Sequence, residues 1–497
     1  MKVSELLHQL SANGASVTLR GAEGGIDPQL LRACFDSRLV QPGDLFCGLG
    51  GYRTDGRRYL SQAFERGAAA FLLQGEEHYG SVPHLCLPES CSPVEVATLA
   101  GQIAHTLAGR PSGSLWVGAV TGTNGKSTVV HLLEHAMSEC GVATACGGTL
   151  GLRFQDQEQA ICNTTPPADV LHQWLKGVVK SHGEAVVLEA SSIGLEQGRM
   201  SGVEVDCAAW TNLSHDHLDM HHTMEAYAKA KAALFLDLGP SAIALLPSNE
   251  NLQKICADSK AQKIIWSCQD SAADLRGSCN FDASGMRLEI DGVFGKGLIQ
   301  SPLIGQHNAE NLLVAFGMMR AKGISADAAC HALQSCAAAP GRLQRVAPEF
   351  QGRLFVDYAH SPEALEHVLK ALREAFPQSR VGVVFGAGGD RDCEKRGPMG
   401  LAAGNNADWC VVTSDNPRCE DPAQIAAAVA KGVQATTCPN ILELDRRRAI
   451  RLAVERLLPG DVLLLAGKGH ETYQEINDVR HSFDDRVELR EAVACLA

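Results

Sequence analysis

The sequence predicts an α/β protein of three domains, a fold class indicated by its length, its alternating segments and its polar strand ends. At 497 residues the chain exceeds one ordinary hydrophobic core, so two or three domains are expected. Apolar runs typical of buried strands alternate with helical patterns, which favours βα units on mostly parallel sheets. Several of these runs end in glycine-rich or polar clusters, where ligands bind in open parallel sheets.

Breaks in the pattern divide the chain into three predicted domains. Residues 1–107 carry short strand-like pieces and end in a helical pattern, which the breaker at residues 109–113 follows. Residues 108–339 begin with a glycine-rich loop and form a P-loop ATPase-like parallel-sheet domain. Residues 340–497 repeat the alternation of strands and helices and are predicted to form a Rossmann-like domain.

Composition narrows the class of protein. A net charge of −13 argues against nucleic acid as a bulk partner. No run of about 18 apolar residues occurs, so no membrane span is expected, and the N-terminus lacks the pattern of a signal peptide. The 18 cysteines form no Cys-x-x-Cys pair, which disfavours zinc or a disulfide framework and favours a cytoplasmic location.

The stretch Val120-Thr121-Gly122-Thr123-Asn124-Gly125-Lys126-Ser127-Thr128 carries the most chemistry. It joins an apolar run to a helical pattern, and such a strand, turn and helix start can bind the phosphates of a nucleotide. Lys126 can reach the β- and γ-phosphates, and the Ser127 hydroxyl can ligate Mg²⁺. Val120 stands where the standard P-loop has its first glycine, and a tight structural turn is the alternative.

Three further features of the central domain could serve this site. Glu189 ends an apolar run, as a Mg²⁺-binding carboxylate in a P-loop domain does, or it caps a helix. Residues 211–222 are rich in His and Asp but lack zinc-ligand spacing, so a metal role stays open against a surface loop. Lys231 lies beside Lys229 in a helical pattern, and spacing alone favours neither lysine.

Four polar clusters follow strands of the third domain. They are Asp357-Tyr358-Ala359-His360, residues 386–392, Ser414-Asp415-Asn416-Pro417-Arg418 and Gly467-Lys468-Gly469-His470-Glu471. Because carboxyl ends of parallel strands share one edge of a sheet, these clusters are expected to face one crevice. For Asn416-Pro417 a plain turn is the alternative.

These motifs resemble those of the Mur ligases, the ATP-dependent amide-bond-forming enzymes of peptidoglycan synthesis. The resemblance covers all three domains and implies a small N-terminal α/β domain that binds UDP. Besides the P-loop and the four clusters above, its markers are Asp36-Ser37-Arg38, Pro42-Gly43-Asp44, Asn163-Thr164-Thr165-Pro166 and residues 212–219.

The resemblance implies the addition of meso-2,6-diaminopimelate to UDP-N-acetylmuramoyl-L-alanyl-D-glutamate. ATP would phosphorylate the glutamate γ-carboxylate, and the diamine would attack the acyl phosphate, because a carboxylate alone lacks a usable leaving group. Mg²⁺ is the implied cofactor, and the chain is expected to be a monomer. The alternatives are a lysine-adding ligase, a folylpolyglutamate synthase-like enzyme, and a nucleotide-binding regulator without ligase activity.

The resemblance also implies roles for individual residues. The catalytic set would be Lys126, Glu189, His217 and Lys231, and the metal set Ser127, Glu189, His217 and Lys231, the last as an N6-carboxylysine formed with CO₂. ATP would contact Gly122, Thr123, Asn124, Gly125, Lys126, Ser127, Thr128, Asn308, Arg342 and Asp357. The UDP-sugar peptide would contact Ser37, Asn163, Thr164, Thr165, Ser191, Gln197 and Arg199. Diaminopimelate would contact Arg391, Asp415, Asn416, Arg418, Gly467 and Glu471.

Specificity for the diamine has a physical reason. Diaminopimelate carries a second carboxylate that lysine lacks, and Arg418 offers a planar, bidentate partner for it. Four residues depart from the family pattern. Ile193 replaces a frequent His, Ser127 replaces a frequent Thr, and Cys393-Glu394 replaces the Lys-Gly at the start of Lys-Gly-Lys-Arg. Ser127 keeps the hydroxyl, whereas Ile193 removes an imidazole.

Overall fold

The computed structural model describes residues 1–21, 25–50, 54–75, 79–80, 82–282 and 285–496. The chain divides into two compact units. The first comprises Met1–Leu275 and Val314–Ala329, and the second comprises Arg276–Leu313 and the residues from Cys330 onward. Each of the three predicted parts carries its own mainly parallel sheet, which confirms the α/β fold class.

The N-terminal part of the first unit is a five-stranded sheet covered by helices. Its one antiparallel pair joins β1 to β5, and the other neighbours are parallel. In the order β1-β5-β4-β3-β2 the strands are β1 (Thr18–Arg20), β5 (His84–Leu87), β4 (Ala70–Gln74), β3 (Asp44–Cys47) and β2 (Arg32–Cys34). The helices are α1 (Val3–Ala12), α2 (Leu60–Glu65) and α3 (Pro93–Ala108), with the 3-10 turns η1 (Ser37–Leu39), η2 (Gly56–Tyr59) and η3 (Pro111–Ser114).

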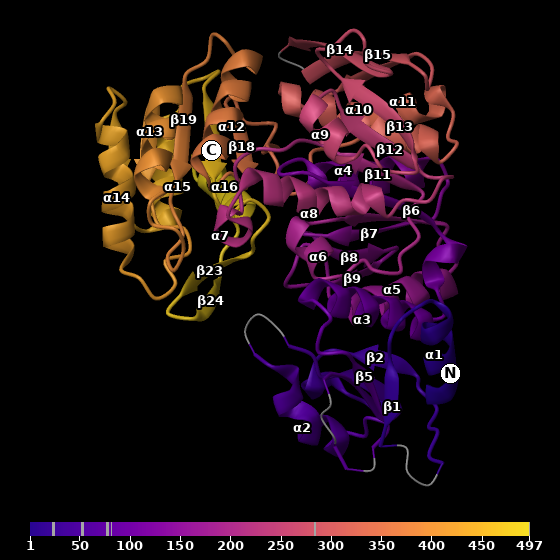
Figure 1. Ribbon diagram of the computed structural model, residues 1–497. Helices are drawn as coiled ribbons and strands as arrows, with labels where there is room; N and C mark the ends of the chain where they lie inside the picture. The colour runs from indigo at the N-terminus through magenta and orange to yellow at the C-terminus, as the bar shows by residue number, and fades with distance from the viewer. Residues whose placement is uncertain (22–24, 51–53, 76–78, 81, 283–284, 497) are drawn as a thin grey trace. The chain divides into compact units, whose positions relative to one another are not determined.

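Helix α3 confirms the helical pattern at the end of the first domain. Its first turn is capped by Ser92, whose hydroxyl accepts a hydrogen bond from the Glu95 amide, and Pro93 occupies the first helical position. It ends at Gly109, whose φ of 91° suits a residue without a Cβ atom. The chain then passes into the central sheet (Figure 1).

The central sheet places β6 (Trp116–Thr121) between β10 (Ala185–Glu189) and β11 (Cys207–Trp210), all parallel. The register pairs Glu189 with Val120 and Trp210 with Thr121, so three strands end side by side. In the first unit the order is β13-β12-β11-β6-β10-β7-β8-β9, completed by β7 (Thr144–Gly148), β8 (Gly151–Phe154), β9 (Gln157–Gln159), β12 (Ile243–Pro247) and β13 (Gln262–Ser267).

Helices α5 and α8 bury apolar side chains against one face of this sheet. Leu171 and Leu175 of α5 and Phe235 of α8 share a hydrophobic core with Val117 and Val186 of the strands. Strands that are buried on both faces have continuous apolar sequences, and the strands of this sheet show such sequences. The helices are α4 (Lys126–Glu139), α5 (Ala168–Lys180), α6 (Ser192–Glu196), α7 (Leu218–His221), α8 (Met224–Leu236) and α9 (Glu250–Ile255).

The second unit carries a six-stranded sheet with helices on both faces. All its neighbours are parallel except β17 and β18. The order is β17 (Gln344–Val346), β18 (Arg353–Asp357), β22 (Val462–Ala466), β19 (Val381–Phe385), β20 (Trp409–Val412) and β21 (Asn440–Leu442). The unit also holds β15 (Gly285–Gly292) paired with β16 (Gly297–Ser301) beside β14 (Leu275–Asp282), and the hairpin of β23 (Tyr473–Ile476) and β24 (Val479–Ser482).

Two separate cores lie on the two faces of the six-stranded sheet. One core joins the strands to α12 (Pro362–Ala375), α13 (Arg396–Asn406) and α14 (Pro422–Gln434). The other joins them to α15 (Arg446–Glu455) and α16 (Asp485–Ala494). Helix α12 begins after Ser361, whose hydroxyl accepts a hydrogen bond from the Ala364 amide. The remaining helices are α10 (Gln306–Ala321) and α11 (Ala326–Gln334).

Candidate active site

The P-loop follows β6 and leads into α4, which begins at Lys126. Gly122 has a φ of 145° and Gly125 a φ of 88°, in the region that favours glycine. A Cβ atom at Gly122 would overlap the Thr211 Oγ1 atom, so no larger residue fits there. The turn is thus tight enough to direct its amides toward an anion at the start of α4.

The segment after β11 holds the P-loop in place. The Asn212 carbonyl accepts a hydrogen bond from the Thr123 amide at 3.0 Å, and the Asn212 Oδ1 atom accepts one from the Asn124 amide at 2.9 Å. Lys126 Nζ donates to the Gly122 and Thr123 carbonyl oxygens, both at 2.8 Å. Ser127 and Thr128 are buried. Their burial is consistent with a preformed phosphate loop.

Glu189 lies at the end of β10 and is 2% exposed, which does not fit a solvated helix cap. Its Oε2 atom accepts hydrogen bonds from Ser127 Oγ at 3.0 Å and from Thr149 Oγ1 at 3.1 Å. The Thr149 amide donates to Oε1 at 2.8 Å. A buried carboxylate beside a hydroxyl offers the hard oxygen ligands that Mg²⁺ prefers. The sequence did not reveal Thr149, because this residue belongs to none of the motifs.

The structure separates the two lysines that the sequence could not. Lys231 is 1% exposed, and its Nζ atom donates to the Gly122 carbonyl oxygen at 2.8 Å. Burial, together with the nearby Lys126, holds the pKa of Lys231 well below its ordinary value. Lys229 faces solvent and pairs with Glu225 at 2.8 Å. Only Lys231 therefore lies at the P-loop.

Of the four histidines in the His-rich segment, His215, His217 and His222 are exposed and His221 is buried. His217 has a φ of 54°, and its exposed ring lies 6.0 Å from that of Tyr227. His221 is buried, and its Nε2 atom lies 2.9 Å from Ser192 Oγ. Within the described parts of the chain, no group of three or more His, Cys, Asp or Glu side chains could hold a metal ion. His221 was not assigned a role from the sequence.

Most residues predicted to contact the muramoyl peptide form one connected cluster beside Glu189. Thr165 Oγ1 donates to the Glu189 carbonyl oxygen at 2.8 Å and lies 3.0 Å from Ser191 Oγ. Arg199 Nη1 donates to the Thr165 carbonyl oxygen at 2.7 Å, and Arg199 Nε donates to Gln197 Oε1 at 3.0 Å. Burial lowers the pKa of Arg199.

The other three predicted peptide and UDP contacts have different surroundings. Thr164 Oγ1 lies 3.2 Å from Thr149 Oγ1, which connects it to the Glu189 cluster. Asn163 is exposed. Ser37, in η1 of the N-terminal part, donates its hydroxyl hydrogen to Gln62 Oε1 at 2.7 Å.

Two of the predicted ATP contacts in the second unit, Asp357 and Arg342, lie at or near the end of β18. Asp357 ends that strand, and its carboxylate accepts hydrogen bonds from the Leu343 amide at 2.6 Å and the Ala359 amide at 2.7 Å. Burial raises the pKa of Asp357. The Arg342 guanidinium lies 4.8 Å from the centre of the Tyr358 ring. Asn308 is buried in α10 and donates to the Ile304 carbonyl oxygen at 2.8 Å.

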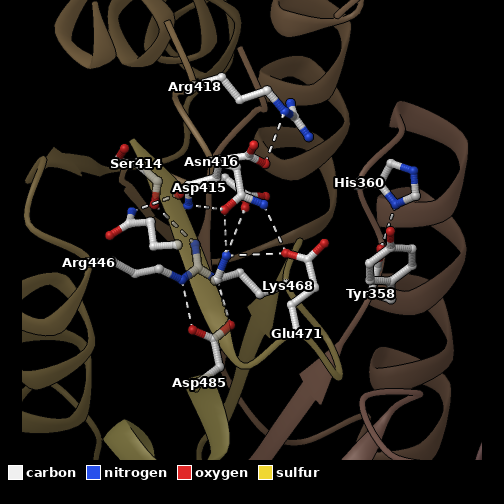
Figure 2. Close-up of polar contacts among 12 residues, drawn as sticks. Tyr358, His360, Ser414, Asp415, Asn416, Arg418, Arg446, Lys468, Glu471 and Asp485 are labelled. Atoms are coloured by element: carbon white, nitrogen blue, oxygen red, sulfur yellow. Dashed lines mark hydrogen bonds and ion pairs between the residues drawn. The ribbon is translucent and has the colours of Figure 1, made fainter. Parts of the chain in front are cut away.

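Five of the six predicted diaminopimelate contacts follow β20 or β22. Figure 2 shows Asp415, Asn416, Arg418 and Glu471 among them. Asn416 Nδ2 donates to Glu471 Oε2 at 2.9 Å. Gly467 has a φ of 113°, and a Cβ atom there would lie 2.5 Å from Asp415 Oδ2. Asp415, Asn416 and Glu471 thus form one polar cluster at the carboxyl edge of the sheet.

Two arginines were predicted to meet carboxylates of the amino acid. Arg418 has a φ of 50°, donates from Nη1 to the Gly389 carbonyl oxygen at 2.6 Å, and lies 3.6 Å from Glu475 through Nε. Arg391 is exposed. Lys468 belongs to one of the polar sequence clusters, but the sequence predicted no role for it. The structure buries its side chain fully in the cluster of Figure 2.

Among the helices that the structure describes, none has the length and apolar character needed to span a membrane.

Comparison with known proteins identifies the family. Three family models match the chain: the Mur ligase middle domain over residues 120–319, the Mur ligase glutamate ligase domain over 341–469, and the Mur ligase family catalytic domain over 34–101. The chain is 40% identical to a UDP-N-acetylmuramoyl-L-alanyl-D-glutamate–2,6-diaminopimelate ligase from Ectopseudomonas mendocina over 96% of this chain and 97% of that protein.

Two further relatives carry the same name. One, from Synechococcus elongatus, is 37% identical over 98% of this chain and 99% of its own length. The other is a solved structure with a TM-score of 0.69 and 34% identity, which covers 94% of this chain and 95% of that one. The chain therefore belongs to the Mur ligase family.

Proposed function

We propose that this chain is the ATP-dependent ligase that joins meso-2,6-diaminopimelate to UDP-N-acetylmuramoyl-L-alanyl-D-glutamate in peptidoglycan precursor synthesis. The observation that carries the proposal is the meeting of the P-loop, Glu189 and the segment after β11 at the ends of three adjacent parallel strands. The names of the curated relatives, which match nearly the full chain, support the same reaction.

The P-loop would hold the ATP phosphates. Lys126 and the loop amides supply positive charge and donors for the triphosphate. Ser127, Glu189 and His217, with the carbamate of Lys231, would hold Mg²⁺; the buried oxygen pair of Ser127 and Glu189 fits this ion. Bound Mg²⁺ would offset the negative charge of the phosphates and of the substrate carboxylate.

Lys231 would act as its carbamate. The reaction with CO₂ needs a neutral amine, and burial beside Lys126 favours that form of Lys231. Nitrogen bonds to the carbon of CO₂ and loses a proton, which turns a potential cation into an anion. An anion at this position suits a site where Lys126 is close.

Phosphoryl transfer would activate the acceptor acid. The γ-carboxylate of the D-glutamate residue would attack the γ-phosphate of ATP and displace ADP. An amine of diaminopimelate would then attack the carbonyl carbon of the acyl phosphate, which releases phosphate and a proton. Two anions must approach each other in the first step, so Lys126 and Arg199 would reduce their repulsion. Thr164, Thr165, Ser191 and Gln197 would orient the muramoyl peptide, with Asn163 beside them and Ser37 at the UDP end.

The second unit would bind the adenosine and the amino acid. Asn308, Arg342 and Asp357 would contact adenine, phosphate and ribose. Arg391 and Arg418 would pair with carboxylates of diaminopimelate, and Asp415, Asn416, Gly467 and Glu471 would surround an amine. We further propose that the reaction takes place in the cytoplasm, where ATP and the UDP-linked precursor would be available, and that the chain acts as a monomer.

A phosphate-release assay tests the proposal. Purified protein with ATP, Mg²⁺ and the UDP-muramoyl dipeptide should release phosphate only after diaminopimelate is added, and mass spectrometry should detect the tripeptide product. Lysine in place of diaminopimelate should give a rate at least about 100-fold lower, because lysine lacks the carboxylate that Arg418 would bind. A nucleotide-binding regulator would release no phosphate with either amino acid, and a lysine-adding ligase would reverse the preference.

A further inference from the structure

Lys468 is a fully buried cation in the cluster proposed to hold the amine. It follows β22, between Gly467 and Gly469, and its side chain is 0% exposed. Its Nζ atom donates to Asn416 Oδ1 at 3.0 Å and to Glu471 Oε2 at 3.2 Å (Figure 2). Burying an ammonium group costs several kcal/mol unless anions and acceptors surround it, so these contacts account for its position.

The contacts of Lys468 fix the side chains around it. Glu471 Oε2 accepts hydrogen bonds from both Lys468 Nζ and Asn416 Nδ2, the latter at 2.9 Å. Asn416 Oδ1 accepts from both Lys468 Nζ and the Glu475 amide, the latter also at 2.9 Å. Each of these two acceptors therefore has two donors, and Lys468 is the donor common to both.

One acceptor in the cluster remains open. Asp415 Oδ1 lies 3.5 Å from Lys468 Nζ, is buried, and accepts no hydrogen bond within the part of the chain that the structure describes. A buried carboxylate oxygen without a donor costs free energy, unless a ligand supplies one. An ammonium group has three donors and would satisfy it.

The charges of the cluster also leave room for one cation. Asp415 and Glu471 carry two negative charges, and Lys468 carries one positive charge. The neighbouring Arg446 has its own anion, because its Nε and Nη2 atoms donate to Asp485 at 2.7 and 2.6 Å, with both side chains 0% exposed. The cluster thus keeps one negative charge in excess. Figure 2 shows its three charged side chains together with Arg446 and Asp485.

We propose that Lys468 is a positioning residue for the amino-acid substrate. It fixes Asn416 and Glu471 and balances one of two carboxylates, so that the cluster presents Asp415 Oδ1 and one unbalanced negative charge to the non-reacting ammonium group of the diamine. This inference rests on the proposed function, because it takes diaminopimelate as the amino acid.

Steady-state kinetics of Lys468→Met test the inference. The KM for diaminopimelate should rise at least about 10-fold, since a charge-assisted contact is worth roughly that factor, whereas the KM values for ATP and the sugar nucleotide should stay within about two-fold. The matched control is Arg380→Met. Arg380 directly precedes β19 and pairs with Asp461, which directly precedes β22. This ion pair therefore lies at the amino ends of the strands, whereas the Lys468 cluster lies at their carboxyl ends. The control should leave all three KM values unchanged.

A substrate analogue tests the same claim without a variant. The analogue 2-aminopimelate keeps both carboxylates and the reacting amine but lacks the second ammonium group. Wild-type protein should show a KM at least about 10-fold higher for 2-aminopimelate than for diaminopimelate, and Lys468→Met should bring this ratio toward one. An unchanged ratio in the variant would mean that Lys468 does not act through the ammonium site.

If the Lys468→Met variant does not fold, Lys468→Arg provides a second test of the inference. Arginine keeps the charge but not the compact ammonium geometry, so the KM for diaminopimelate should rise about three- to ten-fold with the KM for ATP unchanged. An equal rise in all KM values, or no rise in any, would overturn the inference and leave the proposed function intact. Failure of the wild-type protein to use diaminopimelate would instead overturn the proposed function itself.

Discussion

The Nζ atom of Lys231 lies 4.5 Å from the centre of the Tyr227 ring. The same aromatic side chain donates its hydroxyl hydrogen to Thr123 Oγ1 at 3.3 Å, so one residue of α8 contacts both the buried lysine and the P-loop. Burial raises the pKa of Tyr227 to about 12, which keeps the phenol protonated. Lys231 is therefore held against the P-loop from two sides, by Tyr227 and by the Gly122 carbonyl.

Lys231→Ala should lower kcat by at least about 100-fold, because the variant loses the anion proposed to help position Mg²⁺. Short carboxylates such as formate or acetate should restore part of the rate by occupying the space that the side chain leaves. Lys229→Ala is the matched control, because Lys229 lies two residues earlier in α8, faces solvent and pairs with exposed Glu225. Wild-type rates in Lys231→Ala would refute the carbamate role.

The stability of the fold should depend on pH through Lys231. Its pKa is lowered in the folded protein by burial and by Lys126, so the unfolded chain binds a proton more readily than the folded chain below the ordinary value of 10.5. The free energy of unfolding should therefore rise with pH between the lowered pKa and about 10.5, by up to about 1.4 kcal/mol per pH unit. Urea denaturation in CO₂-free buffer would measure this slope.

The control for this pH dependence is a pair of variants on one helix. Lys231→Met should remove the slope and stabilise the protein at neutral pH, because no ammonium has to be neutralised on folding. Lys229→Met should keep the slope of the wild type, since Lys229 is exposed. If the free energy of unfolding changed with pH equally in the wild type and in Lys231→Met, this result would contradict the lowered pKa of Lys231.

Much of the fold follows from local sequence patterns. The runs Ala185–Glu189 and Val381–Phe385 are buried strands, and the glycine-rich and polar residues after such runs are the loops at the carboxyl edge. Strand order is a different matter, because it depends on pairing between distant segments. Only the position of β6 between β10 and β11 brings Glu189 beside Ser127, and no local pattern contains that information.

The choice between neighbouring residues also required tertiary structure. Lys229 and Lys231 stand in the same helical pattern, and packing against Tyr227 and Gly122 decides which one is buried. Lys468 lies in a motif that the sequence displays openly, yet its partner Asn416 comes from another strand end. Motifs therefore predicted which loops carry polar chemistry, whereas burial and partners determined what each side chain contacts.

Ser127 should tolerate threonine but not alanine. Its hydroxyl donates to Glu189 Oε2 at 3.0 Å and is the proposed Mg²⁺ ligand in the P-loop. Ser127→Ala should raise the Mg²⁺ concentration needed for half-maximal phosphate release at least about 10-fold, because one oxygen ligand is lost. Ser127→Thr keeps the hydroxyl and serves as the control, with wild-type Mg²⁺ dependence expected. If Ser127→Ala and the wild type needed the same Mg²⁺ concentration for half-maximal phosphate release, Ser127 would not be a ligand of the metal.

Arg418 should decide between diaminopimelate and lysine. Its guanidinium is held by the Gly389 carbonyl and lies 3.6 Å from Glu475, so the side chain is fixed in direction before a substrate arrives. Arg418→Ala should raise the KM for diaminopimelate by about 10- to 100-fold, through loss of a bidentate carboxylate partner, and should leave the KM for lysine nearly unchanged.

The preference for diaminopimelate over lysine should therefore shrink in Arg418→Ala. Competition between the two amino acids in one phosphate-release assay, with product masses read by mass spectrometry, measures this ratio directly. Arg480→Ala is a suitable control, because the Arg480 guanidinium lies 4.2 Å from the centre of the Tyr473 ring in the same hairpin region and has no proposed contact with substrate. Arg418 would lose its proposed role if its variant discriminated as strongly as the wild type. The carboxylate that distinguishes the two amino acids would then have to be recognised elsewhere, with Arg391 as the remaining predicted arginine.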